Sequence, residues 1–202
     1  MVDFTLNPAR TALLNVDMQR CFIEDSPIAA PQGRAVLERI NRLAAVCREA
    51  GILVVHTAHV YRPDGSNWGV AAELNPVVRT GIVNQGSAAA ALHPDLVVDP
   101  RDIRLEKCRY GAFQSTDLEL ILRARGVDSV IVGGLVTNVC CDTTAREAMQ
   151  RDFRVFFLSD GTGTVPFDDI PAETMQRVAL ATMARIAGQV LSVADMIAKI
   201  RG

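Results

Sequence analysis

Three residues of this chain have side chains and sequence surroundings suited to nucleophilic chemistry: Asp17, Lys107 and Cys140. Cys140 ends a glycine-containing stretch, residues 133–140, where a helix is predicted to begin. The unpaired N–H groups of a helix start favour a thiolate, and a nearby ammonium would lower the thiol pKa further. An adjacent carboxylate could accept the thiol proton. The three residues are therefore a sensible chemical set, although residue types alone do not select them from the rest of the chain.

The elements that must position these groups alternate between short apolar strands and longer helices, which is the pattern of a mostly parallel α/β sheet. Strands are predicted at residues 11–16, 52–57, 102–107, 129–133, 155–158 and 189–191. Helices are predicted at residues 35–50, 117–125, 138–151, 172–187 and 193–200. Ligands of open parallel sheets bind at the carboxyl ends of the strands. Asp17, Lys107 and Cys140 all fall there.

Composition and charge exclude several other classes of protein. The 202 residues suit one domain, residues 1–202, which buries enough surface to need no disulfide or metal for stability. The net charge is −2, with the basic residues spread along the chain, which argues against nucleic acid or an anionic membrane as partner. No apolar run approaches the ~18 residues of a membrane span. The start of the chain lacks the pattern of a secretory signal, and five cysteines without metal-site spacing indicate free thiols, so we expect a cytoplasmic protein.

Three segments of the chain resemble the isochorismatase-like cysteine hydrolases, and they occur in that family's order. ALLNVDMQ at 12–19 is similar to the family's opening strand. KCRYGAF at 107–113, followed by TDL at 116–118, resembles its lysine segment. GLVTNVC at 134–140, followed by TTAREA at 143–148, resembles its nucleophile elbow. The resemblance implies one α/β domain with a Rossmann-like, open, mostly parallel sheet that has helices on both faces.

The resemblance also implies roles for individual residues. Cys140 would attack the substrate carbonyl, Asp17 would move the proton, and Lys107 would hold the pair in its charged state. A non-proline cis peptide would join Leu135 to Val136, and the backbone N–H groups of Val136 and Cys140 would form an oxyanion hole. The implied reaction is hydrolysis of a small amide, ureido or carbamoyl C–N bond through a thioester, with release of ammonia or an amine.

Two other functions stay open at this stage. One is the vinyl ether cleavage of isochorismatases, although family members known for that reaction do not use a cysteine nucleophile. The other is a non-catalytic binding protein that has kept the fold. The chain also departs from the family pattern: Arg20-Cys21 replaces a commoner Asn-Asp, Gly111 replaces a frequent Ser, and Cys141 stands where Val is usual.

The irregular stretch at residues 58–100 is predicted to form long loops with short helices that overhang the site. For Trp68, a half-buried anchor and a residue of the pocket wall are equally good interpretations. For Arg62, a solvated side chain is preferred to a contact with an acidic substrate group. The candidate substrate-binding residues, taken together, are Phe22, Tyr61, Asn67, Trp68 and Thr137.

No metal or nucleotide cofactor is expected. His56 and His59 lie three apart on a predicted strand and would point to opposite faces. The chain also lacks the Asp-x-His signature of metal-binding nicotinamidases and a G-x-G-x-x-G fingerprint. The expected partners are a small amide or ureide and further copies of the chain, in a dimer or tetramer, with the apolar stretch at 178–196 as a plausible contact surface.

Overall fold

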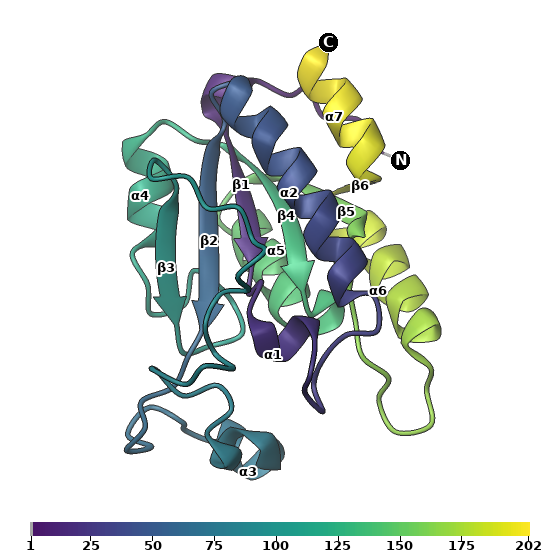
Figure 1. The fold of residues 1–202 in the computed structure, drawn as a ribbon. Coiled ribbons are helices and arrows are strands. Elements are labelled where there is room, and N and C mark those ends of the chain that lie inside the picture. Colours follow the sequence, from purple (N-terminus) through teal and green to yellow (C-terminus); the bar gives the residue numbers. More distant parts are fainter. Residues whose placement is uncertain (1) are drawn as a thin grey trace.

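The computed structural model describes residues 2–202, which form one twisted sheet between two layers of helices (Figure 1). The strand order is β3-β2-β1-β4-β5-β6, and every pairing of neighbours is parallel. The predicted α/β class, with an open parallel sheet flanked by helices on both faces, is confirmed. The strands are β1 (Thr11–Val16), β2 (Leu53–His59), β3 (Ile103–Lys107), β4 (Ser129–Leu135), β5 (Arg154–Gly163) and β6 (Gln189–Leu191).

Two helices cover one face of the sheet and three cover the other (Figure 1). On the first face α2 (Gly33–Glu49) and α7 (Val193–Arg201) contribute Ile40 and Met196, both fully buried, to one core cluster. The helices of the second face are α4 (Leu118–Ala124), α5 (Asp142–Met149) and α6 (Ala172–Ile186). In α2 the buried positions recur every three or four residues, which is why this segment folds as an amphipathic helix. None of the helices formed by residues 2–202 is long and apolar enough to cross a bilayer.

The centre of the sheet is β1, which is buried along its whole length because helices cover both of its faces. Its neighbours are β2 on one side and β4 on the other, so the strand order reverses direction between β1 and β4. Sheets with this order bind ligands in the crevice outside the carboxyl ends of the strands at that switch point. The ends of β1 and β4 are the places where Asp17 and the stretch leading to Cys140 begin.

The main difference from the prediction is that some strands are longer than predicted, because they continue into polar or glycine-containing segments. β5 continues to Gly163 because the β4–β5 register shifts between Val132 and Gly134, which allows residues 162–163 to pair with residues 134–135. The helix predicted from residue 138 is divided into a five-residue π-helical segment, η3 (Thr137–Cys141), and α5. The short helix α1 (Arg20–Ile23) was not predicted.

The long stretch at residues 58–100 is irregular, as predicted. Its first part lies below the arrowheads of the sheet in Figure 1, and its last part returns along the sheet to the start of β3. Its helical elements are α3 (Ala71–Leu74) and the 3₁₀ turn η2 (Pro76–Thr80). A further 3₁₀ turn, η1 (Pro8–Arg10), leads into β1.

Candidate active site

Asp17 follows β1 directly and is held in place by Thr57 near the end of β2. Its backbone has a left-handed φ of 51°, which Asp tolerates better than most residues. The Asp17 N–H donates to the Thr57 carbonyl and hydroxyl at 3.2 and 3.1 Å, and the Thr57 hydroxyl donates to Asp17 Oδ1 at 2.6 Å. One carboxylate oxygen is thus fixed by Thr57. The other, Oδ2, has no hydrogen-bond partner within residues 2–202.

Lys107 is the last residue of β3, and its fully buried ammonium lies beside the free oxygen of Asp17. Its Nζ is 2.7 Å from Asp17 Oδ2, and the two form a buried ion pair. The same Nζ donates to the carbonyls of Arg109 and Tyr110 at 3.1 and 2.9 Å. Burial by itself lowers the pKa of Lys107, but the pairing with the Asp17 carboxylate opposes it and the pKa is raised. Lys107 therefore remains an ammonium at neutral pH.

Helix α5 holds the segment that supplies these carbonyls. The Ala112 N–H donates to the Thr144 hydroxyl at 3.1 Å, and the Phe113 N–H donates to Glu147 Oε2 at 3.0 Å. A Cβ added at Gly111 would lie 2.1 Å from the same Glu147 oxygen. This close approach explains why glycine stands here in place of the serine frequent in the family.

Cys140 lies in η3, which follows β4 at the switch point of the sheet. Gly134 has a φ of 118°, and a Cβ there would be 2.0 Å from the Val16 carbonyl oxygen, so β4 can pass β1 only with glycine at this position. The Leu135–Val136 peptide is cis, as the resemblance implies. Val136 and Cys140 both border the same cavity.

The structure corrects the expectation that the start of the helix makes Cys140 a thiolate. The side chain is almost completely buried, and its burial, together with the charge of Asp17, outweighs the opposing charge of Lys107. The pKa of the Cys140 thiol is raised to about 12. The resting thiol is therefore protonated, and attack on a substrate requires a base beside it. The Asp17 carboxylate lies beside the thiol and is the candidate base.

A cavity of 740 Å³ opens beside Cys140 and reaches into the loops that follow β1, β2 and β5. Two of the predicted substrate-binding residues, Phe22 and Tyr61, line it. The lining residues are Phe22, Pro27, Ile28, Ala29, Pro31, His59, Tyr61, Asn75, Val77, Val78, Val83, Tyr110, Val136, Val139, Cys140, Val165, Pro166 and Phe167.

The other three predicted substrate-binding residues do not line this cavity. Asn67 is used within its own loop, where its side-chain oxygen accepts from the Arg62 N–H at 2.8 Å. Trp68 packs against the core on the α2 face. Thr137 is fully buried and donates to Gln176 Oε1 at 2.6 Å, which connects η3 to α6.

Sequence reasoning missed most of the lining, including the polar residues His59, Asn75 and Tyr110, and it also missed one positioning residue, Gln19. His59 ends β2, and its Nδ1 lies 3.3 Å from the Arg109 carbonyl oxygen; Tyr110 lies next to it, with ring centroids 5.8 Å apart. Burial, with the charge of Lys107, lowers the pKa of His59 to about 4, so the ring is neutral. Gln19 is fully buried and pairs with the backbone N–H and carbonyl of His59 at 2.7 and 3.0 Å. Gln19 was part of the recognised 12–19 segment, which was the available signal.

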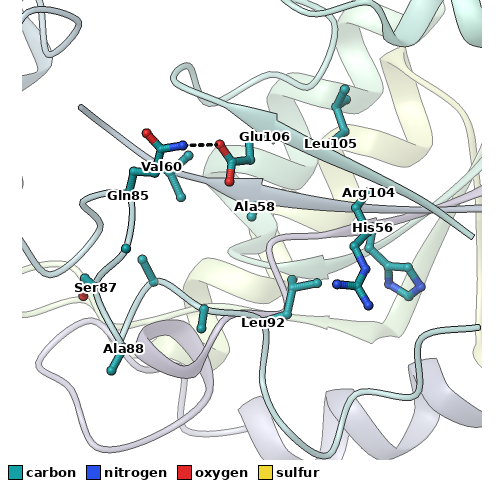
Figure 2. Close-up of a pocket in the computed structure, with 13 residues that line it drawn as sticks. His56, Ala58, Val60, Gln85, Ser87, Ala88, Leu92, Arg104, Leu105 and Glu106 are labelled. Atoms are coloured by element: carbon teal, nitrogen blue, oxygen red, sulfur yellow. Dashed lines mark hydrogen bonds between the residues drawn. The ribbon is translucent and has the colours of Figure 1, made fainter. Parts of the chain in front are cut away.

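A second hollow, of 660 Å³, lies over β2 and β3 and contains none of the three candidate catalytic residues (Figure 2). Figure 2 shows His56 and Arg104 at one end and Glu106 at the other, where Glu106 accepts a hydrogen bond from Gln85 at 3.2 Å. His56 and His59 thus lie in different hollows. Across residues 2–202, no three His, Cys, Asp or Glu side chains are grouped so that they could hold a metal ion.

The chain thus combines an open, parallel α/β sheet with a buried carboxylate, ammonium and thiol at the carboxyl ends of its strands. The isochorismatase domain family matches residues 11–195 of the chain. The chain therefore belongs to the isochorismatase family.

Named relatives agree with this placement. The ureidoacrylate amidohydrolase RutB of Methylobacterium radiotolerans is 33% identical over 94% of this chain and 79% of its own length. Nicotinamidase 3 of Arabidopsis thaliana is 36% identical over 78% of this chain and 75% of its own length. The crystal structure of a cysteine hydrolase from Pseudomonas syringae pv. phaseolicola 1448A superposes with a TM-score of 0.95, at 34% identity, over 99% of this chain and 96% of that one. The two named relatives are hydrolases of C–N amide bonds, which confirms the predicted enzyme class.

Proposed function

We propose that this chain is a cysteine-dependent hydrolase of small amides, ureides or carbamoyl compounds that works through a thioester on Cys140. The observation that carries the proposal is the buried Asp17–Lys107 pair, whose Oδ2 and Nζ atoms lie 2.7 Å apart and which adjoins a buried, protonated thiol at the wall of a cavity. The amidohydrolase relatives support the same reaction class.

In the first half of the reaction Asp17 accepts the Cys140 proton as the sulfur bonds to the substrate carbonyl carbon. The positive charge of Lys107 offsets the negative charge that then develops on sulfur and on the carbonyl oxygen. The N–H groups of Val136 and Cys140 are proposed to donate to that oxyanion. Collapse of the tetrahedral intermediate breaks the C–N bond, and protonated Asp17 gives its proton to the departing nitrogen. Ammonia or an amine leaves, and a thioester remains.

In the second half water attacks the thioester, and Asp17 accepts a proton from that water. The second tetrahedral intermediate expels the Cys140 sulfur, which takes the proton back from Asp17. The acid product leaves, and the three side chains return to their starting protonation states.

The proposal is tested by release of ammonia from a panel of small amides and ureides, with wild-type protein and Cys140→Ser side by side. Turnover by the wild type and its near-complete loss in the folded variant is the expected result. Pyruvate release from isochorismate with no ammonia from any amide would instead favour vinyl ether cleavage. Absence of both activities, with Cys140 inert to thiol reagents, would favour a binding protein.

We also propose a cytoplasmic homo-oligomer, a dimer or tetramer. The proposed nucleophile must stay reduced, and all five cysteines are free thiols, which suits a reducing compartment. Val178 and Ile186 on α6 are 58% and 49% exposed, and they are apolar surface that a second copy could cover. Cell fractionation and light scattering test these two statements; a monomer in dilute solution would contradict the second.

A further inference from the structure

The cavity beside Cys140 is lined almost entirely by apolar side chains. Apart from Cys140 itself, its polar lining consists of four residues, none of which is Asp, Glu, Lys or Arg: His59, Tyr61, Asn75 and Tyr110. The remaining lining consists of valines, prolines, phenylalanines, an isoleucine and an alanine. A cavity of 740 Å³ has the size of an ordinary small-molecule site, so this surface surrounds most of a bound substrate.

The titratable side chains in the lining are uncharged at neutral pH. Burial, with the charge of Lys107, lowers the pKa of His59 to about 4. Burial raises the pKa of Tyr61 to about 12 and also raises that of Tyr110. The wall therefore offers polar groups that can form neutral hydrogen bonds, but no charge to pair with an ion.

Lys107 and two arginines that lie close in sequence to lining residues are already engaged. Lys107 is held by Asp17 and two carbonyls, behind the reacting thiol. Arg79 donates from Nε to the Ala72 carbonyl at 2.9 Å. Arg109 donates from Nη1 to the carbonyls of Asn67 and Cys108 at 2.9 and 2.7 Å.

We propose, on the basis of the function proposed above, that this site selects amides whose acyl group is uncharged and mainly apolar, and that it rejects acyl groups that carry a carboxylate. A carboxylate that enters this cavity would lose its hydration without gaining a cation, and an unpaired buried charge is strongly disfavoured. A branched aliphatic or aromatic acyl group would bury apolar surface against the valines and Phe22 instead. Ureido acids, which bear a carboxylate, are then poor substrates for this chain.

Three amides of equal heavy-atom count test the selection: 4-methylpentanamide, succinamide and succinamate. They share the chain that leads to the scissile amide and differ at the far end, which is an isopropyl group, a neutral amide or a carboxylate. We expect kcat/KM for ammonia release to fall in that order, with 4-methylpentanamide at least ~100-fold above succinamate. Equal values for the first and last, or a preference for succinamate, would overturn the inference.

The matching aldehydes separate this inference from the proposed reaction. 4-Methylpentanal and 4-oxobutanoate can form reversible thiohemiacetals with Cys140, and protection of Cys140 from iodoacetamide reports their binding without any amide turnover. Protection by 4-methylpentanal at much lower concentration than by 4-oxobutanoate supports the selection, even if no amide is hydrolysed. Equal protection, no protection by either, or stronger protection by 4-oxobutanoate contradicts it, even if amides are hydrolysed.

A pair of charge insertions provides the matched control. Phe167 lines the cavity and is 40% exposed, whereas Ile170 is 43% exposed, faces it across the same turn and does not line the cavity. The two residues exchange backbone hydrogen bonds of 3.1 and 2.8 Å, which a change of side chain leaves in place. Phe167→Arg should raise kcat/KM for succinamate relative to 4-methylpentanamide about fivefold, and Ile170→Arg should leave the ratio unchanged. The same ratio in both variants would show that the charge of the lining does not govern selection.

Discussion

Two clusters of buried charged side chains lie at opposite ends of β3, and only one of them has a thiol beside its carboxylate. At the start of β3, Asp102 accepts from Arg48 at 2.6 and 3.1 Å and from His56 at 2.9 Å. The second nitrogen of His56 is 3.3 Å from the side-chain amide of Asn15. The charged side chains of this first cluster are therefore hydrogen-bonded to one another. His56 also borders the hollow shown in Figure 2.

At the other end of β3, Lys107 is paired with Asp17, whose Oδ2 has no hydrogen bond within residues 2–202. The Asp17 carboxylate lies beside the thiol of Cys140, which lines the cavity. Buried charge beside a hollow is thus common to both clusters. The difference is a thiol beside the carboxylate, and this distinguishes a site suited to proton transfer from a cluster that holds strands together.

The largest predicted effect uses one substitution in each cluster. Asp17→Asn removes the base, so kcat should fall by about 10²–10⁴-fold, the usual contribution of a positioned proton acceptor, while the fold is retained. Asp102→Asn should instead lower the melting temperature and leave kcat of the folded protein near the wild-type value. Steady-state kinetics and circular dichroism on both variants measure this contrast. An Asp17→Asn protein with near-normal kcat, or a stable but inactive Asp102→Asn protein, would reverse the assignment of the two clusters.

A smaller effect is expected at Gly111. This residue directly follows Arg109 and Tyr110, whose carbonyls accept hydrogen bonds from Lys107, and it packs against α5. A side chain there collides with Glu147, since its Cβ would lie 2.1 Å from Oε2. Gly111→Ser should therefore shift the segment that positions Lys107 and reduce kcat about 10- to 100-fold. The double variant with Glu147→Ala makes room for the new side chain, so partial recovery of kcat is expected. No loss in the single variant would show that the segment adapts without moving Lys107.

Two of the three buried histidines, His56 and His59, predict a loss of stability in mild acid. Their pKa values are lowered in the folded protein by burial, that of His59 to about 4, whereas an unfolded histidine titrates near ~6.5. The unfolded chain then binds more protons below that value, so the free energy of unfolding should decrease as pH falls from about 6.5 towards 4. For His59 the decrease amounts to about 3 kcal/mol. Urea titrations of the wild type and His59→Phe at several pH values check this; equal slopes against pH in the two proteins would refute the role of His59.

The smallest effect is expected at Cys141, the neighbour of the proposed nucleophile. Its side chain is fully buried in the core cluster on the α5 face, and it is absent from the lining of the cavity. Buried free cysteine behaves as a small apolar residue. Cys141→Val should therefore change kcat less than about twofold and the free energy of unfolding by less than ~1.5 kcal/mol. Loss of activity in a folded Cys141→Val protein would contradict this placement.

The sequence predicted the sheet, and it selected three residues that the structure brings together, because both depend on local signals. The continuous apolar run at residues 11–16 is typical of a strand that helices cover on both faces. The three segments that resemble the family contain Asp17, Lys107 and Cys140. Contacts between distant residues could not be predicted. Thr57 contacts Asp17 from the neighbouring strand, 40 positions further along the chain. Likewise, nothing near Gly111 in the sequence indicates that Glu147 packs against it.

The same limit explains the errors in the predicted pocket. Asn67 and Trp68 are in the loop that was expected to cover the site, but they turn towards their own loop and the core. His59 was considered only as a metal ligand, because its place beside Tyr61 and Tyr110 arises from tertiary packing. The thiol pKa was expected to be low from the start of the helix, whereas burial, which the sequence does not quantify, raises it to about 12.

The most direct test of the central claim is to trap the acyl group on the protein. The p-nitrophenyl ester of 4-methylpentanoic acid is mixed with the protein, quenched with acid and analysed by intact-mass and peptide mass spectrometry. We predict one acyl group per chain, attached to Cys140, with the same adduct in Cys141→Val and none in Cys140→Ser. An adduct on Cys141, or full turnover by a Cys140→Ser protein that carries no adduct, would contradict Cys140 as the nucleophile.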